Sequence, residues 1–333
     1  MLATSSLLEK KELGSNLFNN YTNFMTIFSI VFFKTVSVLL SVIIGFLAGK
    51  YSNVERDSIA SLLFYFISPI VFFSIPAGTT LTLSALSITL VTFTIATLLC
   101  ITAYYIFGMY WQDHTRNILA LSAGTANSGY FMLPIAAALF DDYTLSIYMM
   151  AVIGVTIYET TVGYYICARS FSSTKDSIIK VIKLPILNAF VFGCILSFSG
   201  FTLPDFLDDF TYNMRGAFSI LGMVMVGLGL STLKKFEVDV KFTLAAFAAK
   251  FLLYPLFINI FILLDRFFFG WYDTNYYNAL QLLSTAPMAA NIIVIASLQK
   301  FHPERVAASV LLSLLFVLIY APVMVSIFLS DLD

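Results

Sequence analysis

The stretch GTANSGYFMLP at residues 124–134 interrupts an apolar segment that is long enough to cross a membrane. A second stretch, STAPMAAN at residues 284–291, interrupts another such segment in the second half of the chain. A helix in hydrocarbon gives up backbone hydrogen bonds only where the freed groups face protein or a water-filled cavity. Two breaks at matching places of two halves are typical of the central site of a secondary transporter.

The composition indicates an all-α polytopic membrane protein. Hydrophobic residues make up 59% of the 333 residues and charged residues 11%, whereas a soluble domain is about 45–50% apolar and about 25% charged. The lipid bilayer is therefore an expected partner. The net charge of −1 provides no field suited to nucleic acid, so we exclude nucleic-acid binding.

We predict ten membrane-spanning helices joined by short loops, since each span needs about 20 apolar residues. Their approximate ranges are 26–49, 57–76, 83–108, 117–140, 145–168, 183–200, 210–231, 241–264, 276–299 and 305–329. Residues 1–25 are polar and predict a short, loosely ordered arm, and residues 169–182 predict a linker loop. The loop separates five helices, 26–168, from five more, 183–329. If these halves are repeats, the odd number in each makes them an inverted repeat.

The loop charges predict the orientation. Twelve Lys and Arg residues fall on the side of the 169–182 loop: Lys50, Arg56, Arg116, Arg169, Lys175, Lys180, Lys183, Lys234, Lys235, Lys241, Lys300 and Arg305. Four fall on the other side: Lys10, Lys11, Arg215 and Arg266. The positive-inside rule then places the linker loop in the cytoplasm and both termini outside it.

The two breaks supply groups that suit a small organic anion. Half-helix N-termini carry partial positive charge and can hold a carboxylate without a full cation. Side-chain amides and hydroxyls add hydrogen bonds without the desolvation cost of a charge. The alternative is that these polar groups only bridge helices. The candidate substrate-binding residues are Thr125, Asn127, Ser128, Gly129, Tyr130, Pro134, Pro287, Ala290 and Asn291.

Three ionisable residues lie within predicted spans: Lys34, Glu159 and Lys250. A charge there costs about 3 kcal/mol on insertion scales, so each needs water or a partner. Glu159 and Lys250 lie near the middle of their helices. We expect them to form an ion pair, which is either structural or a proton-responsive coupling device. Lys34 lies nearer a helix end and is assigned no transport role.

Metal and cofactor sites have no support in the sequence. The three cysteines, Cys100, Cys167 and Cys194, lie in apolar segments and are expected to be small buried hydrophobes. His114 and His302 have no Cys or His partner at ligand spacing. No cofactor and no metal are therefore expected.

The stretch at residues 124–134 resembles the fourth-helix signature of the auxin efflux carrier family. Other landmarks of that family follow in order: ISPIVFF at 67–73, LGMVMVGLGL at 221–230, KFLLYP at 250–255 and APMAAN at 286–291. The resemblance covers about residues 26–329. The chain departs from it at Ala126-Asn127-Ser128, where members often have Asn-Thr-Gly, and at Met288, where a second Pro is absent. The resemblance therefore does not identify the substrate.

The resemblance implies a fold like that of sodium/bile-acid symporters and sodium/proton antiporters, with helices four and nine broken and crossing. It implies a scaffold at about 26–76 and 183–231 and a moving transport domain at about 83–168 and 241–329. A homodimer that pairs through the scaffold helices is compatible with this arrangement. The protein would be an integral protein of the plasma membrane or of a bacterial inner membrane.

We interpret the chain as an efflux carrier or exchanger of a small organic anion, such as an auxin-like or other mono- or dicarboxylate, with an elevator-type motion. One alternative is an ion-coupled bile-acid-like symporter or a cation/proton antiporter. Another is a ligand-sensing receptor built on the same fold. An enzyme is not expected, because the spans hold no paired Asp, no Ser/His pair and no His-Glu-x-x-His. A Walker loop is also absent from the sequence.

Single-cysteine labelling tests the predicted orientation. In intact cells, an impermeant thiol reagent is expected to modify Leu207→Cys and not Lys175→Cys, because the charge bias places only position 207 outside. The parent chain is the control, since its own cysteines lie in apolar segments. Labelling at position 175 alone would overturn the orientation.

Overall fold

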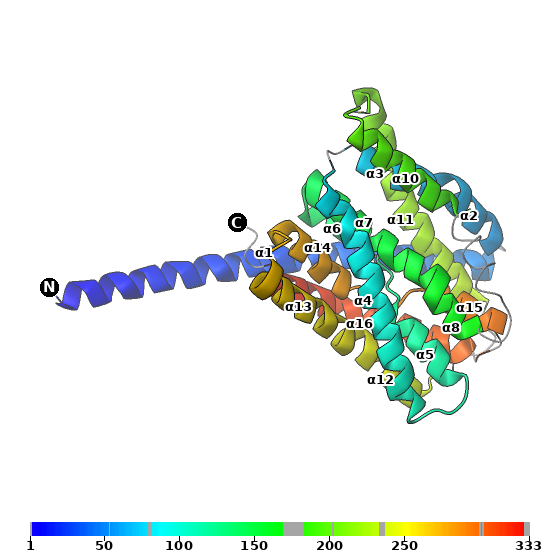
Figure 1. Cartoon of the computed structure of the whole chain (residues 1–333). Helices are drawn as coiled ribbons and strands as arrows, with labels where there is room; N and C mark the ends of the chain where they lie inside the picture. Colours follow the sequence, from blue (N-terminus) through cyan, green and yellow to red (C-terminus); the bar gives the residue numbers. More distant parts are fainter. Residues whose placement is uncertain are drawn as a thin grey trace.

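The computed structural model describes residues 2–52, 54–78, 81–168, 183–201, 203–232, 237–299, 301 and 303–329. For residues 2–21, 56, 294 and 297–299 it describes the backbone only. The regular elements of the described residues are all helices (Figure 1). Most of the predicted linker loop, with Lys175, lies outside the described residues, as do Lys234, Lys235, Lys300 and His302.

In the first half, several helices continue through a π-helical turn, labelled η. The elements are α1 (Leu2–Tyr51), α2 (Arg56–Leu62), η1 (Leu63–Ile67), α3 (Ser68–Ala77), α4 (Leu83–Gly108), α5 (Thr115–Gly124), α6 (Leu133–Leu139), α7 (Asp142–Tyr158), η2 (Glu159–Gly163) and α8 (Tyr164–Ala168). Asp141 caps α7, and hydrogen bonds from the Thr144 side chain and backbone lower the pKa of its carboxyl group.

In the second half, the elements are α10 (Pro185–Phe198), the 3₁₀ turn η3 (Asp205–Leu207), α11 (Asp208–Ser231), α12 (Val240–Ala248), η4 (Ala249–Leu253), α13 (Tyr254–Leu264), η5 (Asp265–Phe269), α14 (Thr274–Ser284), α15 (Asn291–Gln299) and α16 (Pro303–Phe328). Helices α12, η4, α13 and η5 follow one another without interruption and form one apolar rod.

Seven helices of the described residues are long and apolar enough to cross a membrane. They are Thr22–Tyr51, Asp57–Ala77, Leu83–Gly108, Asp142–Cys167, Asp205–Ser231, Val240–Phe269 and Pro303–Phe328. The protein is therefore an integral membrane protein. The other three predicted spans have a different form: 183–200 contains the 14-residue α10, and 117–140 and 276–299 are each divided into two short helices.

The arm predicted at residues 1–25 is not a separate loose segment in the structure. Helix α1 begins at Leu2 and continues to Tyr51. The physical reason is local, because the Leu, Glu and Lys residues of this segment are strong helix formers and no Pro interrupts them. The charged residues make the segment polar, but they do not prevent it from forming a helix.

Two close helix contacts organise one part of the molecule. Helix α1 packs along α11, where a Cβ at Gly45 would lie 2.0 Å from the Val224 carbonyl oxygen. Helix α10 packs along α3, where a Cβ at Gly193 would lie 2.4 Å from the Phe73 carbonyl oxygen. Glycine permits this approach because it has no side chain to separate the backbones.

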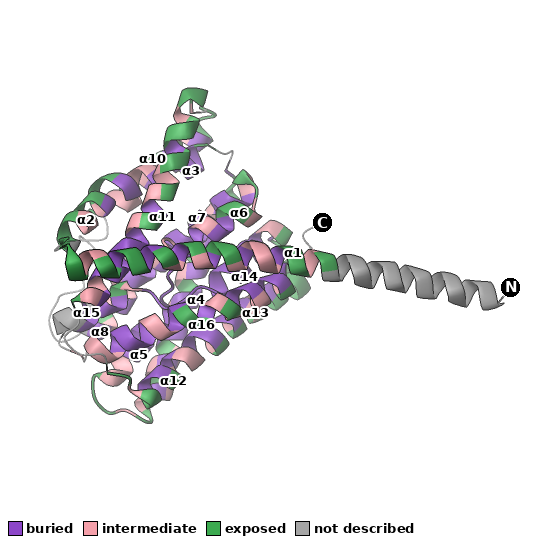
Figure 2. Ribbon diagram, turned by 180° about the vertical axis from the view of Figure 1, so that it is seen from behind, coloured by how far each residue is buried: buried purple, intermediate pink, exposed green. Residues whose placement is uncertain are grey.

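Helix α7 lies in the interior of the bundle. It contacts α4, α14 and α3, and most of its residues are buried (Figure 2). By contrast, the part of α1 whose side chains are described has exposed apolar residues along its length, including Phe33, Leu40 and Ile44. Exposed apolar side chains on a spanning helix are suited to contact with lipid.

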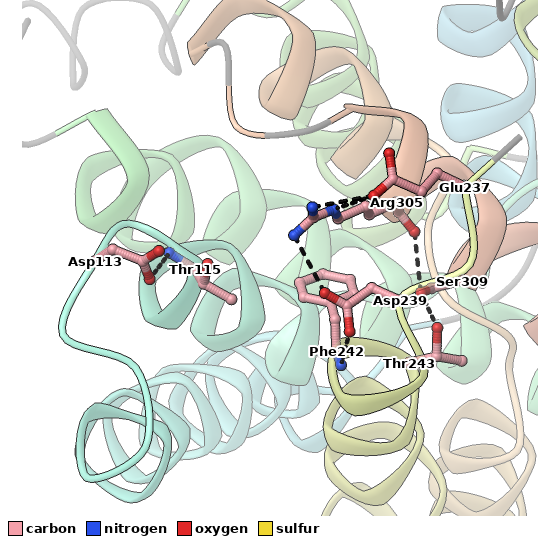
Figure 3. A network of polar contacts seen from close by, with 8 residues as sticks. All are labelled: Asp113, Thr115, Glu237, Asp239, Phe242, Thr243, Arg305 and Ser309. Atoms are coloured by element: carbon pink, nitrogen blue, oxygen red, sulfur yellow. Dashed lines mark hydrogen bonds and ion pairs between the residues drawn. The ribbon is translucent and has the colours of Figure 1, made fainter. Parts of the chain in front are cut away.

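A polar network joins α12 to α16 at one end of the bundle (Figure 3). The Arg305 guanidinium lies 3.0 Å from Glu237 Oε1 and 3.2 Å from Asp239 Oδ2. Asp239 Oδ1 accepts a hydrogen bond from the Phe242 amide at 3.0 Å and so caps α12. Thr243 and Ser309 are hydrogen bonded at 2.8 Å one turn further into the pair of helices.

Candidate functional site

The two interrupted helices meet at their breaks. Helix α5 ends at Gly124 and α6 begins at Leu133, while α14 ends at Ser284 and α15 begins at Asn291. The backbone amide of Asn127 donates a hydrogen bond to the Pro287 carbonyl oxygen at 2.9 Å. This bond therefore satisfies one backbone polar group in each break, as an interrupted helix in a membrane requires.

The sequence explains where the helices stop. Pro134 lies in the first turn of α6, where a proline has no amide to lose and its fixed φ fits the helix. Pro287 lies between α14 and α15, and it has no N–H to donate to a continuing helix. At Gly124, a Cβ would lie 2.5 Å from the Ala96 carbonyl oxygen and from the Tyr158 ring. Glycine there permits α5 to pack closely on α4 and α7.

Side chains from neighbouring helices hold the breaks in place. The Tyr148 hydroxyl donates to the Ser128 carbonyl oxygen at 2.8 Å, and the Ser219 hydroxyl donates to the Tyr130 carbonyl oxygen. In the second break, the Met288 amide donates to Ser313 Oγ at 3.2 Å. These bonds leave the backbone of the breaks anchored on three different helices.

A pocket of about 750 Å³ lies against both breaks. Six of the nine predicted substrate-binding residues line it: Asn127, Ser128, Gly129, Tyr130, Ala290 and Asn291. Thr125, Pro134 and Pro287 are not among its lining residues. The prediction that the two stretches come together is therefore matched by the geometry. Thr125 and Pro287 contribute backbone carbonyls, which accept hydrogen bonds from Lys250 and from the Asn127 amide.

Ala126 and Ala289 of the two breaks also line the pocket, as does Ile295 of α15. The other lining residues come from outside the two interrupted helices. They are Asp57, Ala60, Ser61, Phe64, Tyr65, Phe72, Val152, Val155, Thr156, Glu159, Thr160, Tyr164, Leu184, Ile186, Phe218 and Met225. Glu159 was singled out as an intramembrane carboxylate, and this signal was informative. The aromatic residues carried no comparable signal, because the chain has 34 Phe and 18 Tyr.

Lys250 does not pair with Glu159, and the predicted ion pair was wrong. In the part of the chain that the structure describes, the ion pairs are those of Arg305. Lys250 is fully buried, its Nζ donates to the Thr125 carbonyl oxygen at 3.1 Å, and it lies 3.7 Å from the centroid of the Tyr254 ring. The physical reason is that the carbonyl end of α5 carries partial negative charge and attracts a cation.

Glu159 instead faces the pocket. It is the first residue of η2 and is 8% exposed. Its side chain lines the pocket together with Asn291, while its Oε1 atom has no hydrogen-bond partner. A buried carboxylate oxygen without a partner is costly, so the site is suited to supply a partner from a ligand or from solvent.

Groups of Cys, His, Asp and Glu that could hold a metal ion are absent among the described residues. The three cysteines are free and buried, as expected. The His114 ring stacks on Phe301 with a centroid distance of 4.6 Å, at a distance from the residues that line the pocket.

The chain is similar to known transport proteins. The model of a family described as membrane transport protein matches residues 168–325. A search of curated proteins found no match. The match lies in the second half of the chain, covers slightly less than half of its residues, and agrees with the resemblance to auxin efflux carriers that the sequence motifs indicated. It supports a role in membrane transport.

Replacing Lys250 tests its role at the place where the two breaks meet, which we call the crossing. Lys250→Met keeps most of the side-chain volume but leaves the Thr125 carbonyl without its donor, which costs about 1–3 kcal/mol for a buried group. The purified protein in detergent is expected to unfold at a lower temperature than the parent. Lys34→Met is the matched control, because Lys34 is exposed. Unfolding of Lys250→Met at the parental temperature would contradict this role.

Proposed function

From the match to a family of membrane transport proteins, we propose that this chain is a secondary transporter that carries a small organic anion through the pocket at the crossing. The observation that carries the proposal is that residues of both breaks, Asn127 and Asn291 among them, line one pocket. An auxin-like acid or another mono- or dicarboxylate is the substrate class proposed.

The chemistry of the pocket supports a carboxylate ligand. Helix α15 begins at Asn291, so its N-terminal amides, which carry partial positive charge, adjoin the pocket. Asn127, Ser128 and Tyr130 add hydrogen-bonding side chains. Apolar side chains such as Phe72, Phe218 and Met225 form much of the rest of the wall, and they suit the organic part of a substrate.

The proposal includes ten spans arranged as a five-plus-five inverted repeat. In this arrangement α5 with α6 and α14 with α15 each cross the membrane once as a broken helix. Two helix contacts support it. Helix α1, the first span of the first half, packs along α11, the second span of the second half. Helix α3, in the second span of the first half, packs along α10, in the first span of the second half. These two pairs would form the scaffold, and the remaining helices the moving domain.

The position of the pocket supports alternating access. Its wall includes Asp57, Tyr164 and Leu184, which lie at the helix ends nearest the 169–182 loop. Further along, the Phe218 ring packs on Tyr130 with a centroid distance of 4.8 Å and on Phe72 with a distance of 5.8 Å. With the orientation predicted from the loop charges, the pocket faces the cytoplasm and the aromatic cluster closes the outer side.

The aromatic cluster lies between the proposed scaffold and the proposed moving domain. Tyr130 belongs to the first break, whereas Phe218 and Gly222 belong to α11. A Cβ at Gly222 would lie 2.1 Å from the Tyr130 ring, so Tyr130 rests directly on the backbone of α11. An elevator-type motion of the crossing past α11 would have to separate this contact.

One observation favours a second candidate, an ion-coupled symporter. The charged residues in the described lining of the pocket are both acidic, Asp57 and Glu159. An acidic lining repels an anion unless a cation binds with it. A ligand-sensing receptor would bind the same ligand without moving it, so flux in proteoliposomes separates a receptor from either carrier.

Removal of the two amides tests the substrate site. A thermal-shift panel of malonate, malate and indole-3-acetate on the purified protein first identifies a ligand, since a ligand at about 100 times its Kd adds roughly 2.7 kcal/mol to apparent stability. Asn127→Ala and Asn291→Ala are each expected to weaken its binding about 10- to 150-fold, because a lost hydrogen bond to a charged group costs about 1.5–3 kcal/mol. Transport into proteoliposomes should fall in parallel.

The control for this experiment is Asn188→Ala, which makes the same change at an exposed position of α10 outside the pocket. It is expected to bind and transport as the parent does. If both pocket variants also bind and transport at parental levels, the substrate site lies elsewhere.

A substitution on α11 tests the proposed outer closure. Gly222→Ala is expected to push Tyr130 away from α11 and open the pocket to the outside, since the added methyl group overlaps the ring. Thr160→Cys, on the pocket wall, should then react with an impermeant thiol reagent in intact cells. Gly216→Ala is the matched control on the same helix, because nothing lies within 4 Å of its Cβ position. Equal labelling in both backgrounds would contradict the closure.

A further inference from the structure

The pocket at the crossing holds a negative charge that the described lining residues do not neutralise. Glu159 and Asp57 are its charged residues, and Lys, Arg and His are absent from its described lining. Asp57 is exposed at the start of α2, where water can solvate it. Glu159 is buried beside Asn291, and its Oε1 atom has no hydrogen-bond partner. Glu159 is therefore the carboxylate that an anionic substrate would meet at the crossing.

Two basic residues of helices that pack near the breaks have other partners. Lys250 donates to the Thr125 carbonyl oxygen and lies over the Tyr254 ring. Arg116 of α5 lies over the Tyr104 ring, with 4.8 Å between its Cζ atom and the centroid. Helix α4, which also packs against η2, contains no charged residue. The described residues therefore supply no counter-charge to Glu159.

The other titratable groups around Glu159 are weak acids. Tyr130 and Tyr164 line the same pocket, as does Tyr65 of η1. Tyr158 adjoins Glu159 in sequence, and its hydroxyl donates to the Leu121 carbonyl oxygen at 3.2 Å. Phenols are uncharged near pH 7, so none of them supplies a positive charge.

A metal cation fits this position poorly. Ca²⁺ takes six to eight oxygen ligands, and Mg²⁺ requires near-octahedral coordination. Among the described residues, no group of three or more His, Cys, Asp or Glu side chains converges anywhere, and Glu159 is the single carboxylate at the crossing. The hydroxyls of the nearby Thr156 and Thr160 donate to backbone carbonyls of their own helix. A proton needs only one carboxylate oxygen and fits the unpartnered Oε1.

We propose that Glu159 is a proton site and that the organic anion and one proton occupy the pocket together. This inference rests on the proposed function for the anion, but the proton site itself does not. A proton from the bulk solution binds Oε1, the neutral carboxylic acid no longer repels the anion, and both leave when the crossing faces the other side. A monoanion would thus move without net charge, in symport with a proton.

Asn291 links the two ligands. It lines the same pocket as Glu159, and it begins the helix whose amides adjoin the pocket. A protonated Glu159 can donate a hydrogen bond where the carboxylate only accepts, so protonation changes the partner that the Asn291 amide finds and frees its N–H groups for an anion. The geometry therefore couples the protonation of Glu159 to anion binding at the same residue.

The proton site is tested first without any substrate. Infrared difference spectra of the purified protein between low and high pH are expected to show the C=O band of a buried carboxylic acid, which Glu159→Gln removes. Asp57→Asn is the matched control, because it makes the same change at an exposed carboxylate of the pocket mouth, and it should keep the band. A band that persists in Glu159→Gln overturns the proton site, whether or not the protein transports an anion.

The coupling is tested with malonate, malate or indole-3-acetate, whichever stabilises the parent. In weakly buffered solution at a pH where Glu159 is ionised, binding should take up one proton per protein in the parent and in Asp57→Asn, and none in Glu159→Gln. Above that pH the apparent Kd of the parent should rise about tenfold per pH unit, while that of Glu159→Gln stays flat.

Glu159→Asp retains a carboxylate and should restore the pH dependence, which separates proton binding from a purely structural effect of the substitution. If Glu159→Gln takes up a proton on binding as the parent does, the coupling to Glu159 is wrong. If none of the three anions binds while the infrared band behaves as expected, the proton site stands and the proposed substrate class fails.

Discussion

The hydrogen bond from the Asn127 amide to the Pro287 carbonyl is the contact on which the rest of the structure depends. Hydrocarbon offers no water to an interrupted helix, so two breaks are stable only where they satisfy one another or face protein. Once they meet, the groups that they do not use lie together and line a pocket. The same contact therefore satisfies backbone groups of the two breaks and brings polar groups together within the membrane.

The buried charges follow from the same crossing. Lys250 stabilises the carbonyl end of α5 by its hydrogen bond to Thr125. The Oε1 atom of Glu159 has no such partner and Glu159 lines the pocket, so its charge is the part of the crossing that a ligand or a proton can change. Lys250 thus supports the backbone, and Glu159 adjoins the proposed substrate site.

The sequence was sufficient to locate the breaks, because Gly, Pro and Asn are conspicuous in an apolar segment. It also identified Asn127, Asn291 and Glu159 as polar groups of interest. It did not give the partner of Lys250, since a single chain shows that two charges are buried but not that a helix end lies nearer than a carboxylate. The roles of Phe72 and Phe218 could not be predicted either, because Phe occurs throughout the chain. Only tertiary packing brings Phe218 against both Tyr130 and Phe72. The first residues of α1 were expected to be loosely ordered because they are polar, but polarity alone does not prevent a helix.

The central claim is that the two breaks together form the substrate site. A structure of the purified protein determined by cryo-electron microscopy with the tightest-binding carboxylate tests it most directly. The account predicts ligand density between Asn127 and Asn291, with the carboxylate directed to the beginning of α15 and Lys250 still bound to the Thr125 carbonyl. Ligand density that contacts neither break would contradict it.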